Sequence, residues 1–263
     1  MPTAGPSREI GELLAHGPNV AGGDVYLGPH CDDVCFSLGA HTHRRRSGVL
    51  LTVCPVGGYI ATPGKTVAEI TDIRLGEEVA FARSCGLVAC HLRIEGASVL
   101  RHDPFDASWL VPNTERIERR LLEALRGLGA ASTAAERPWL FCPGGIGGHI
   151  DHLAVRGTVL RHAAGLAELY RLAFYEDLPY ASVFEKRCAG IADLMRALEG
   201  PPLRRFVLPV ADQHDAKLTM LRLYPSQLPE PPQSLAAFTP SAAPATAHEA
   251  VWTVEAGDFA GSA

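Results

Sequence analysis

The chain has 263 residues, of which 47% are hydrophobic and 20% charged, as in an ordinary globular protein with one large domain or at most two small ones. A net charge of −5 and a pI near 6.1 exclude strong attraction to nucleic acid or to an anionic membrane. No stretch approaches the roughly 18 consecutive apolar residues of a membrane span, and the first residues lack the basic-then-apolar order of a signal peptide.

The seven cysteines are odd in number and contain no C-x-x-C pair. This pattern argues against a disulfide framework and against a structural zinc knuckle. We therefore expect a cytoplasmic protein with reduced thiols that binds neither nucleic acid nor membrane.

In chain order, residues 1–21 are expected to form a loosely attached arm, which can form one helical turn around residues 9–15. Short apolar runs then predict strands at residues 24–28, 48–53, 89–94, 139–142 and 169–175. The proline-rich residues 229–247 predict a mobile loop. Apolar alternation returns in residues 248–254 and predicts an edge strand there.

Helical segments separate the predicted strands. The clearest covers residues 114–128, where Asn113 or Thr114 can cap the first turn. Its apolar positions recur at helical spacing at Ile117, Leu121, Leu125 and Leu128. A similar pattern follows the fourth strand. This alternation predicts a single α/β domain over residues 1–263, with a Rossmann-like, mostly parallel sheet and helices on both faces.

Two clusters of histidine and aspartate follow predicted strands, at the carboxyl ends where such sheets bind ligands. The first strand ends in Gly-Pro-His-Cys-Asp-Asp, residues 28–33, and the fourth is followed by a glycine-rich loop and His-Ile-Asp-His, residues 149–152. Two histidines and one or two aspartates from separate strand ends can converge on one metal ion. Imidazole and carboxylate ligands suit zinc, and three of them leave one position for water.

Spacing indicates which residues can bind together. In a turn that leads into a helix, residues three apart lie on one side, which pairs His30 with Asp33 and leaves Asp32 beside the metal as a base. The same rule pairs His149 with His152, so that one can bind the metal while the other reaches the substrate. Taken singly, Asp32, Asp33 or Asp151 could instead cap a helix, but caps do not account for all of these residues together.

These residues resemble the motifs of a known family. His-Cys-Asp-Asp at residues 30–33 resembles the H-P-D-D motif, and residues 149–152 the H-x-D-H motif, of the LmbE/PIG-L deacetylases, which are zinc-dependent enzymes acting on N-acetylated amino sugars. Further likenesses are an R-x-x-E helix at Arg74–Glu77, its closing turn at Cys85–Leu87, and a late segment with Lys217, Tyr224, Ser226 and Gln227. Together these landmarks run from about residue 24 to residue 227.

The resemblance implies an LmbE-like fold, Zn²⁺ as cofactor, and zinc held by His30, Asp33 and His152. It implies that Asp32 is the general base and that His149, protonated, stabilises the oxyanion and protonates the leaving amine. Asp151 is implied to orient a neighbouring histidine.

The implied reaction is removal of an N-acetyl or other N-acyl group from a small-molecule amino sugar. The breadth of the family favours a soluble amino sugar, a thiol-precursor glycoside or an antibiotic intermediate. Two departures affect the motif: Cys31 replaces its proline and Val34 replaces a frequent glutamate. Neither is expected to touch the metal, and Cys31 is not expected to be a fourth ligand, since a thiolate would weaken the Lewis acidity of zinc.

Two further features are open at the level of sequence. Arg74 could project from the start of its helix as a donor to substrate, or pair with Glu77 or Glu78 on the helix surface. Residues 175–177, Tyr-Glu-Asp, follow the fifth strand and are expected to line the pocket, with the inward side chain undetermined.

Two other functions compete with the hydrolase. A non-haem Fe(II) oxygenase could use His30, Asp32 and His152, with Arg161 as anchor for a cosubstrate, but such sites are normally carried on a jelly roll. A nucleotide-binding module could use residues 144–148, although this loop does not fit G-x-G-x-x-G and the module would leave both histidine–aspartate clusters without a role.

Overall fold

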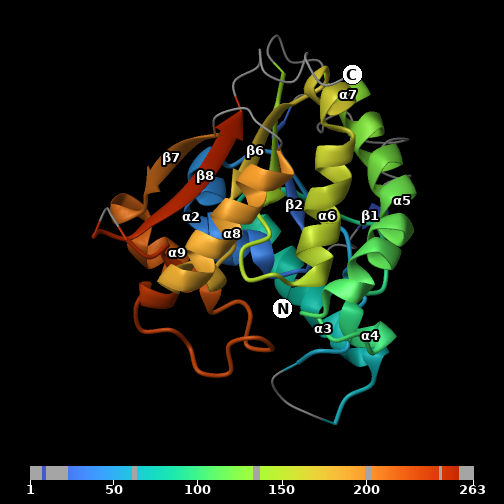
Figure 1. The fold of residues 1–263 in the computed structure, drawn as a ribbon. Helices are drawn as coiled ribbons and strands as arrows, with labels where there is room; N and C mark the ends of the chain where they lie inside the picture. The colour runs from blue at the N-terminus through green and yellow to red at the C-terminus, as the bar shows by residue number, and fades with distance from the viewer. Residues whose placement is uncertain are drawn as a thin grey trace.

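The computed structural model describes residues 8–9, 23–60, 64–132, 137–198, 203–242 and 245–254. Within these ranges the chain forms one eight-stranded sheet with the order β1-β4-β3-β2-β5-β6-β8-β7 (Figure 1). The strands are β1 (Arg8–Glu9), β2 (Val25–Gly28), β3 (Val49–Thr52), β4 (Val88–His91), β5 (Trp139–Pro143), β6 (Arg171–Tyr175), β7 (Leu203–Pro209) and β8 (His248–Val254). The pairs from β1 to β6 are parallel, and β8 pairs antiparallel with both β6 and β7.

Helices cover both faces of the sheet, as predicted for this α/β fold (Figure 1). They are α2 (Asp33–Arg45), α3 (Val67–Ser84), α4 (Ala97–Leu100), α5 (Leu110–Ala130), α6 (Ile150–Arg161), α7 (Ala163–Ala167), α8 (Phe184–Ala197) and α9 (His214–Leu221). Alternate residues of β2 point to opposite faces: Val25 and Leu27 belong to the core under α5, α6 and α7, and Tyr26 to the core under α2, α3 and α9.

All five predicted strands form, with modest shifts of their ends. The last strand is placed wrongly by the sequence, because β8 lies between β6 and β7 and is not an edge strand. The strand that covers it, β7, was not predicted. Most of its side chains are exposed or half-buried, so its sequence lacks the clear apolar alternation that reveals a half-buried strand.

The helix predicted at 114–128 is longer in the structure. It begins at Leu110, directly after a 3₁₀ turn over Ala107–Trp109 whose first amides are capped by the Asp106 side chain, which accepts from the Ser108 N–H. The predicted cap at Asn113 or Thr114 is therefore wrong: both residues are buried inside α5.

Helix α2 is interrupted at Leu38, whose backbone is non-helical. The Glu249 carboxylate of β8 accepts hydrogen bonds from the freed N–H groups of Ala40 and His41, both at 2.8 Å, and from the Lys217 ammonium of α9 at 2.7 Å. Both ionic side chains are fully buried. One family landmark, Lys217, thus joins α9 and α2 to the sheet through β8.

Two predictions concern segments that are only partly described. The helical turn around residues 9–15 lies outside the described residues except for Glu9, which is in β1. Where it is described, the proline-rich stretch 229–247 is irregular apart from a 3₁₀ turn at Ala236–Phe238, and it buries Leu235 and Phe238 in the core under α2.

All seven cysteines lie in the described residues, none of them forms a disulfide, and only Cys188 is exposed. Among the described helices, none combines the length and apolar character needed to cross a membrane.

Candidate metal site

The two histidine–aspartate clusters meet because their strands are neighbours in the sheet. β2 pairs with β3 on one side and with β5 on the other, and the strand order reverses between β2 and β5. Ligands of open α/β sheets bind at such a switch point, beyond the carboxyl ends of the strands. The turn after β2 carries residues 30–33, and the loop after β5 leads into α6 with residues 149–152.

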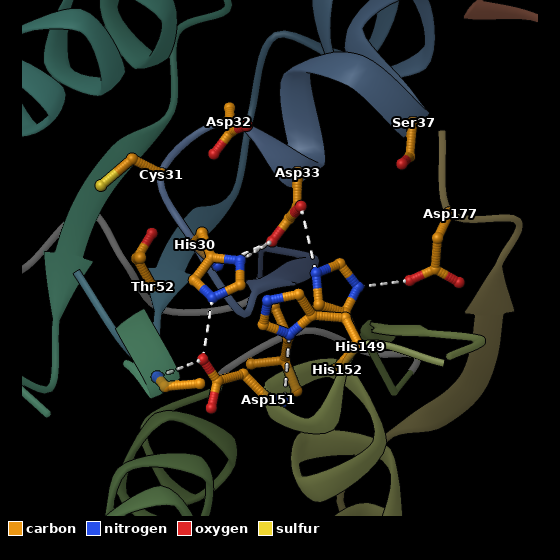
Figure 2. Close-up of polar contacts among 12 residues, drawn as sticks. His30, Cys31, Asp32, Asp33, Ser37, Thr52, His149, Asp151, His152 and Asp177 are labelled. Atoms are coloured by element: carbon orange, nitrogen blue, oxygen red, sulfur yellow. Dashed lines mark hydrogen bonds and ion pairs between the residues drawn. The ribbon is translucent and has the colours of Figure 1, made fainter. Parts of the chain in front are cut away.

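His30, Asp33 and His152 come together as predicted. One donor atom from each lies within 4.8 Å of the others. The Asp33 carboxylate is the centre of the group: Oδ2 is 3.3 Å from His30 Nδ1, and Oδ1 is 3.4 Å from His152 Nε2 (Figure 2). Asp33 is held in turn by the His30 backbone N–H, which donates to Oδ2 at 2.7 Å.

These separations fit a zinc ion. With bonds of about 2.0–2.2 Å, tetrahedral geometry places neighbouring ligand atoms roughly 3.3–3.6 Å apart. Each histidine lies within this range of one Asp33 oxygen, His30 of Oδ2 and His152 of Oδ1. The donor set of two imidazoles and a carboxylate is one that zinc accepts. A second group, formed by His30, His149 and Asp151, satisfies the same 4.8 Å limit, so His30 stands between two sets of potential ligands.

The cluster favours positive charge. Burial by itself lowers the pKa of His30, but the carboxylates of Asp151 and Asp33 outweigh it and raise that pKa from 6.5 to about 10. Burial raises the pKa of Asp33, and the neighbouring His152 and His30 more than reverse this, so the pKa falls well below its usual value. Buried carboxylates that stabilise a proton on imidazole can equally stabilise a divalent cation.

His149 lies at the N-cap of α6, and its Nδ1 accepts a hydrogen bond from the Asp151 N–H at 3.2 Å. The proton of the neutral ring is therefore on Nε2. Burial, His30 and His152 lower the pKa of His149 to about 3. In this arrangement the ring is neutral, so the predicted protonated form is not the resting one.

Asp32 occupies the N-cap position of α2 but makes no side-chain cap. Its Oδ1 accepts a hydrogen bond from Arg74 Nη2 at 2.6 Å, and the two side chains are 14% and 6% exposed. Arg74 lies in the interior of α3, not at its start. Its ion pair is with Asp32 and not with Glu77 or Glu78, which were the partners expected if it lay on the helix surface. Asp32 stands beside the metal-ligand group without belonging to it (Figure 2).

Asp151 is fully buried and orients His30. Its Oδ2 lies 3.0 Å from His30 Nε2 and also accepts from the Ala97 N–H at 2.9 Å, while Oδ1 accepts from Asn113 Nδ2 at 3.1 Å. The carboxylate therefore does not cap α6. The sequence did not indicate this role for Asn113, because the helix was predicted to begin after it, whereas α5 begins at Leu110.

The sequence left open which side chain of the Tyr-Glu-Asp segment after β6 points toward the metal-ligand group. In the structure it is Asp177. Its Oδ1 lies 2.8 Å from His152 Nδ1, and its Oδ2 accepts from the Ile146 N–H at 2.9 Å. A carboxylate behind a ligand histidine fixes the ring and its tautomer. Glu176 points away from the site and accepts hydrogen bonds from Arg187 of α8.

The remaining landmarks support the site from behind. The Glu77 carboxylate accepts from both the N–H and the hydroxyl of Ser226, at 2.8 and 2.5 Å. The Tyr224 hydroxyl donates to the Cys31 carbonyl at 2.9 Å. The Cys31 sulfur points away from the imidazole rings (Figure 2) and belongs to neither potential ligand group, in keeping with the prediction that it is not a ligand.

The two competing functions find no support in this geometry. The oxygenase site required Asp32 beside His30 and His152, but that position belongs to Asp33, and Arg161 is a surface residue paired with Glu118. In the glycine loop, Gly147 has φ +96° and its α-carbon adjoins the Tyr180 ring, since a Cβ there would lie 2.4 Å from Tyr180 Cγ. The loop thus serves chain packing.

A cavity of about 510 Å³ lies at the opposite, amino end of the strands, lined by residues such as Asp24, Trp139 and Arg171. None of the histidines or aspartates of the two potential ligand groups borders it. We therefore assign the chemistry to the carboxyl end of the strands, where acids, bases and potential metal ligands converge.

No protein-family model matches the sequence. The chain is 32% identical over 190 residues to the 2′-N-acetylparomamine deacetylase of Streptomyces fradiae, a match that spans 67% of this chain and 62% of that relative.

Solved structures show the same fold. A deacetylase of the teicoplanin biosynthesis pathway superimposes with a TM-score of 0.64 at 17% identity, covering 88% of this chain and 96% of that one. The A40926 pseudoaglycone deacetylase Dbv21 gives 0.56 at 21% identity, covering 90% and 97%. The chain is thus similar in sequence to one deacetylase, of which it spans less than two thirds, and it shares the fold of two others.

Proposed function

We propose that this chain is a zinc-dependent hydrolase that removes an N-acetyl or similar N-acyl group from an amino sugar, such as an intermediate of antibiotic biosynthesis. The observation that carries the proposal is the convergence of His30, Asp33 and His152 beside Asp32 and His149. The likeness to a 2′-N-acetylparomamine deacetylase supports the substrate class.

His30, Asp33 and His152 would hold the metal, with Asp151 and Asp177 fixing the two rings from behind. When bound, zinc supplies Lewis acidity to the acyl carbonyl and lowers the pKa of a bound water to roughly 7.

The residues around the cluster divide the proton transfers. Asp32 accepts the proton of the attacking water, and Arg74 orients it by donating to one carboxylate oxygen. This makes Arg74 a positioning residue and revises its predicted contact with substrate, since a side chain that is 6% exposed has little surface to offer a sugar.

His149 faces the developing charge with its Nε2–H. It donates to the carbonyl oxygen as that oxygen becomes anionic. The developing negative charge favours the imidazolium, so the ring takes up a second proton on Nδ1 and then delivers its Nε2 proton to the departing nitrogen, since an amine does not leave as an anion. Asp32 releases the proton of the attacking water to solvent, which balances the one that His149 takes up. The products are a free carboxylate, such as acetate, and the amino sugar.

The test combines metal analysis with a screen for newly freed amines on a panel of N-acetylated amino sugars. Asp32→Asn is expected to keep its metal and lose roughly 10²–10⁴-fold in kcat, because only the base is removed. His152→Ala is expected to lose the metal as well. His162→Ala is the matched control, since His162 pairs with Glu118 at the far end of α6, and it should behave as wild type.

The proposal fails if the wild-type chain binds no divalent metal, or if Asp32→Asn deacetylates at the wild-type rate. Iron in the purified protein, with oxygen consumed and no amine released, would restore the oxygenase.

A further inference from the structure

An exposed phenylalanine stands beside the candidate metal site. Phe105, in the loop between α4 and α5, is 55% exposed. Its ring centroid is 5.8 Å from that of His149, with the two rings at 77°. Ligand sites are lined mainly by hydrophobic and aromatic side chains beside a few polar groups that orient the ligand, and Phe105 has this position next to His149.

The loop is attached to the helix that carries His149. The Ile150 N–H in the first turn of α6 donates to the Pro104 carbonyl at 2.8 Å, and the Phe105 N–H donates to Asp103 Oδ1 at 2.9 Å. These two bonds hold the peptide group between Pro104 and Phe105, and the Asp106 N–H, which donates to the Asp103 carbonyl at 3.2 Å, holds the backbone after it. The backbone position of Phe105 relative to His149 is therefore set by the fold.

Tyr180, in the segment after β6, lies between Phe105 and His152 and contacts both rings. Its ring is 6.4 Å from Phe105 and 6.2 Å from His152, nearly perpendicular to both. It packs against the bare α-carbon of Gly147. Tyr180 is half-buried, so it supports Phe105 while Phe105 presents the more accessible ring.

The position of Phe105 indicates which part of a substrate it meets. His149 is the proposed donor to the departing nitrogen, and that nitrogen carries the sugar, whereas the acyl carbonyl must lie among His30, Asp33 and His152. A ring that adjoins His149 therefore lies on the sugar side of the amide. A pyranose offers one face of C–H groups, which is an apolar surface that an aromatic ring can cover.

We propose that Phe105, supported by Tyr180, is the stacking surface for the sugar ring attached to the scissile amide. The inference rests on the proposed function, since it uses the role of His149 there. It makes Phe105 a specificity residue, which favours N-acylated pyranoses over N-acyl compounds without a ring.

The test compares Phe105→Ala, Phe105→Trp and Phe206→Ala with wild type. Phe206 is an exposed phenylalanine on β7 that lines the cavity at the other end of the sheet, so its loss controls for removal of a surface ring. For N-acetylglucosamine, Phe105→Ala should raise KM about tenfold, the upper range for an aromatic contact, with kcat changed less than about twofold. Phe105→Trp should restore KM, and Phe206→Ala should leave it unchanged.

Two further measurements isolate the sugar contact. With N-acetylethanolamine, which has no ring, kcat/KM of Phe105→Ala should equal that of wild type, and an equal loss on both substrates overturns the proposal because Phe105 then acts on the amide. Binding of free glucosamine, measured by calorimetry, should weaken by the same factor as KM. Wild type that binds no glucosamine, or binds it no better than Phe105→Ala, also overturns it.

Calorimetry also separates the two proposals. If no variant releases acetate but Phe105→Ala alone loses glucosamine affinity, the hydrolase is wrong and the stacking surface stands.

Discussion

Asn113 shows how much of the site depends on one amide that sequence reasoning took for a helix cap. Its Nδ2 donates to Asp151 Oδ1, and its own Oδ1 accepts from Arg116 at 3.0 Å. It thus connects α5 to the carboxylate that orients His30. Outer residues of this kind determine how well a ligand histidine is preorganised.

We predict that Asn113→Leu weakens metal binding about tenfold, because Asp151 keeps its charge but loses a donor, and a side chain behind a ligand histidine typically contributes 10–100-fold. Stability should also fall by about 1–3 kcal/mol, the cost of an unsatisfied buried acceptor. Competition against a chelating dye measures the affinity. Val111→Ala, at an exposed position of the same helix, is the control, and unchanged affinity in Asn113→Leu would contradict the connection.

At the scale of elements, the loop between β5 and α6 has to place His149, turn sharply and receive Tyr180. Gly147 and Gly148 both have positive φ, +96° and +78°. They differ in surroundings: a Cβ at Gly147 would lie 2.4 Å from Tyr180 Cγ, while one at Gly148 would meet nothing within 4 Å. Substitutions at these two glycines therefore distinguish the cost of backbone strain from the cost of displacing Tyr180.

We predict that Gly148→Ala loses roughly 1–3 kcal/mol of unfolding free energy through backbone strain alone, and that Gly147→Ala loses more, because Tyr180 must also move. Urea denaturation measures both. Since Tyr180 supports Phe105, Gly147→Ala should in addition raise KM for the amino sugar. Equal stability of the two variants would show that Tyr180 gives way at no cost.

At the scale of the whole molecule, Glu176 holds the C-terminal third of the chain to the parallel sheet. It follows β6 and is 1% exposed. It accepts from Arg187 of α8 at 2.6 and 2.9 Å, from Arg205 of β7 at 2.8 Å, and from Trp252 of β8 at 2.9 Å. Burial by itself raises its pKa, but the hydrogen bonds from Arg187 and Arg205 outweigh it, so the pKa lies below the usual value.

Glu176→Gln is predicted to lower the free energy of unfolding at pH 7 by roughly 3–5 kcal/mol, as for a buried pair that loses one partner. Because the folded pKa is depressed, this contribution is fully present above the unfolded pKa of about 4.3. It is lost as the pH falls through the lower folded value.

The difference between wild type and Glu176→Gln should therefore shrink below about pH 4, as measured by denaturation at a series of pH values. Glu185→Gln, at an exposed position of α8, should show no such difference. If the difference in unfolding free energy between wild type and Glu176→Gln persisted at low pH, the loss of stability would come from packing and not from charge.

The sequence alone determined the features that depend on neighbours a few residues away. Strand and helix periodicity and the three-residue spacing of His30 and Asp33 are local, so they predicted the α/β fold, the parallel core of the sheet and the grouping of the metal-type residues. The resemblance to the LmbE/PIG-L motifs separated the roles of His149 and His152, which spacing had left equivalent.

Only the tertiary structure decided the contacts that complete the site. Arg74 reaches Asp32 across 42 positions of the sequence, Asn113 reaches Asp151 across 38, and Asp177 reaches His152 across 25. The insertion of β8 between β6 and β7 is of the same kind. Such contacts depend on which strands become neighbours and how helices pack on them, and that is set by burial of the whole core, which no local pattern records.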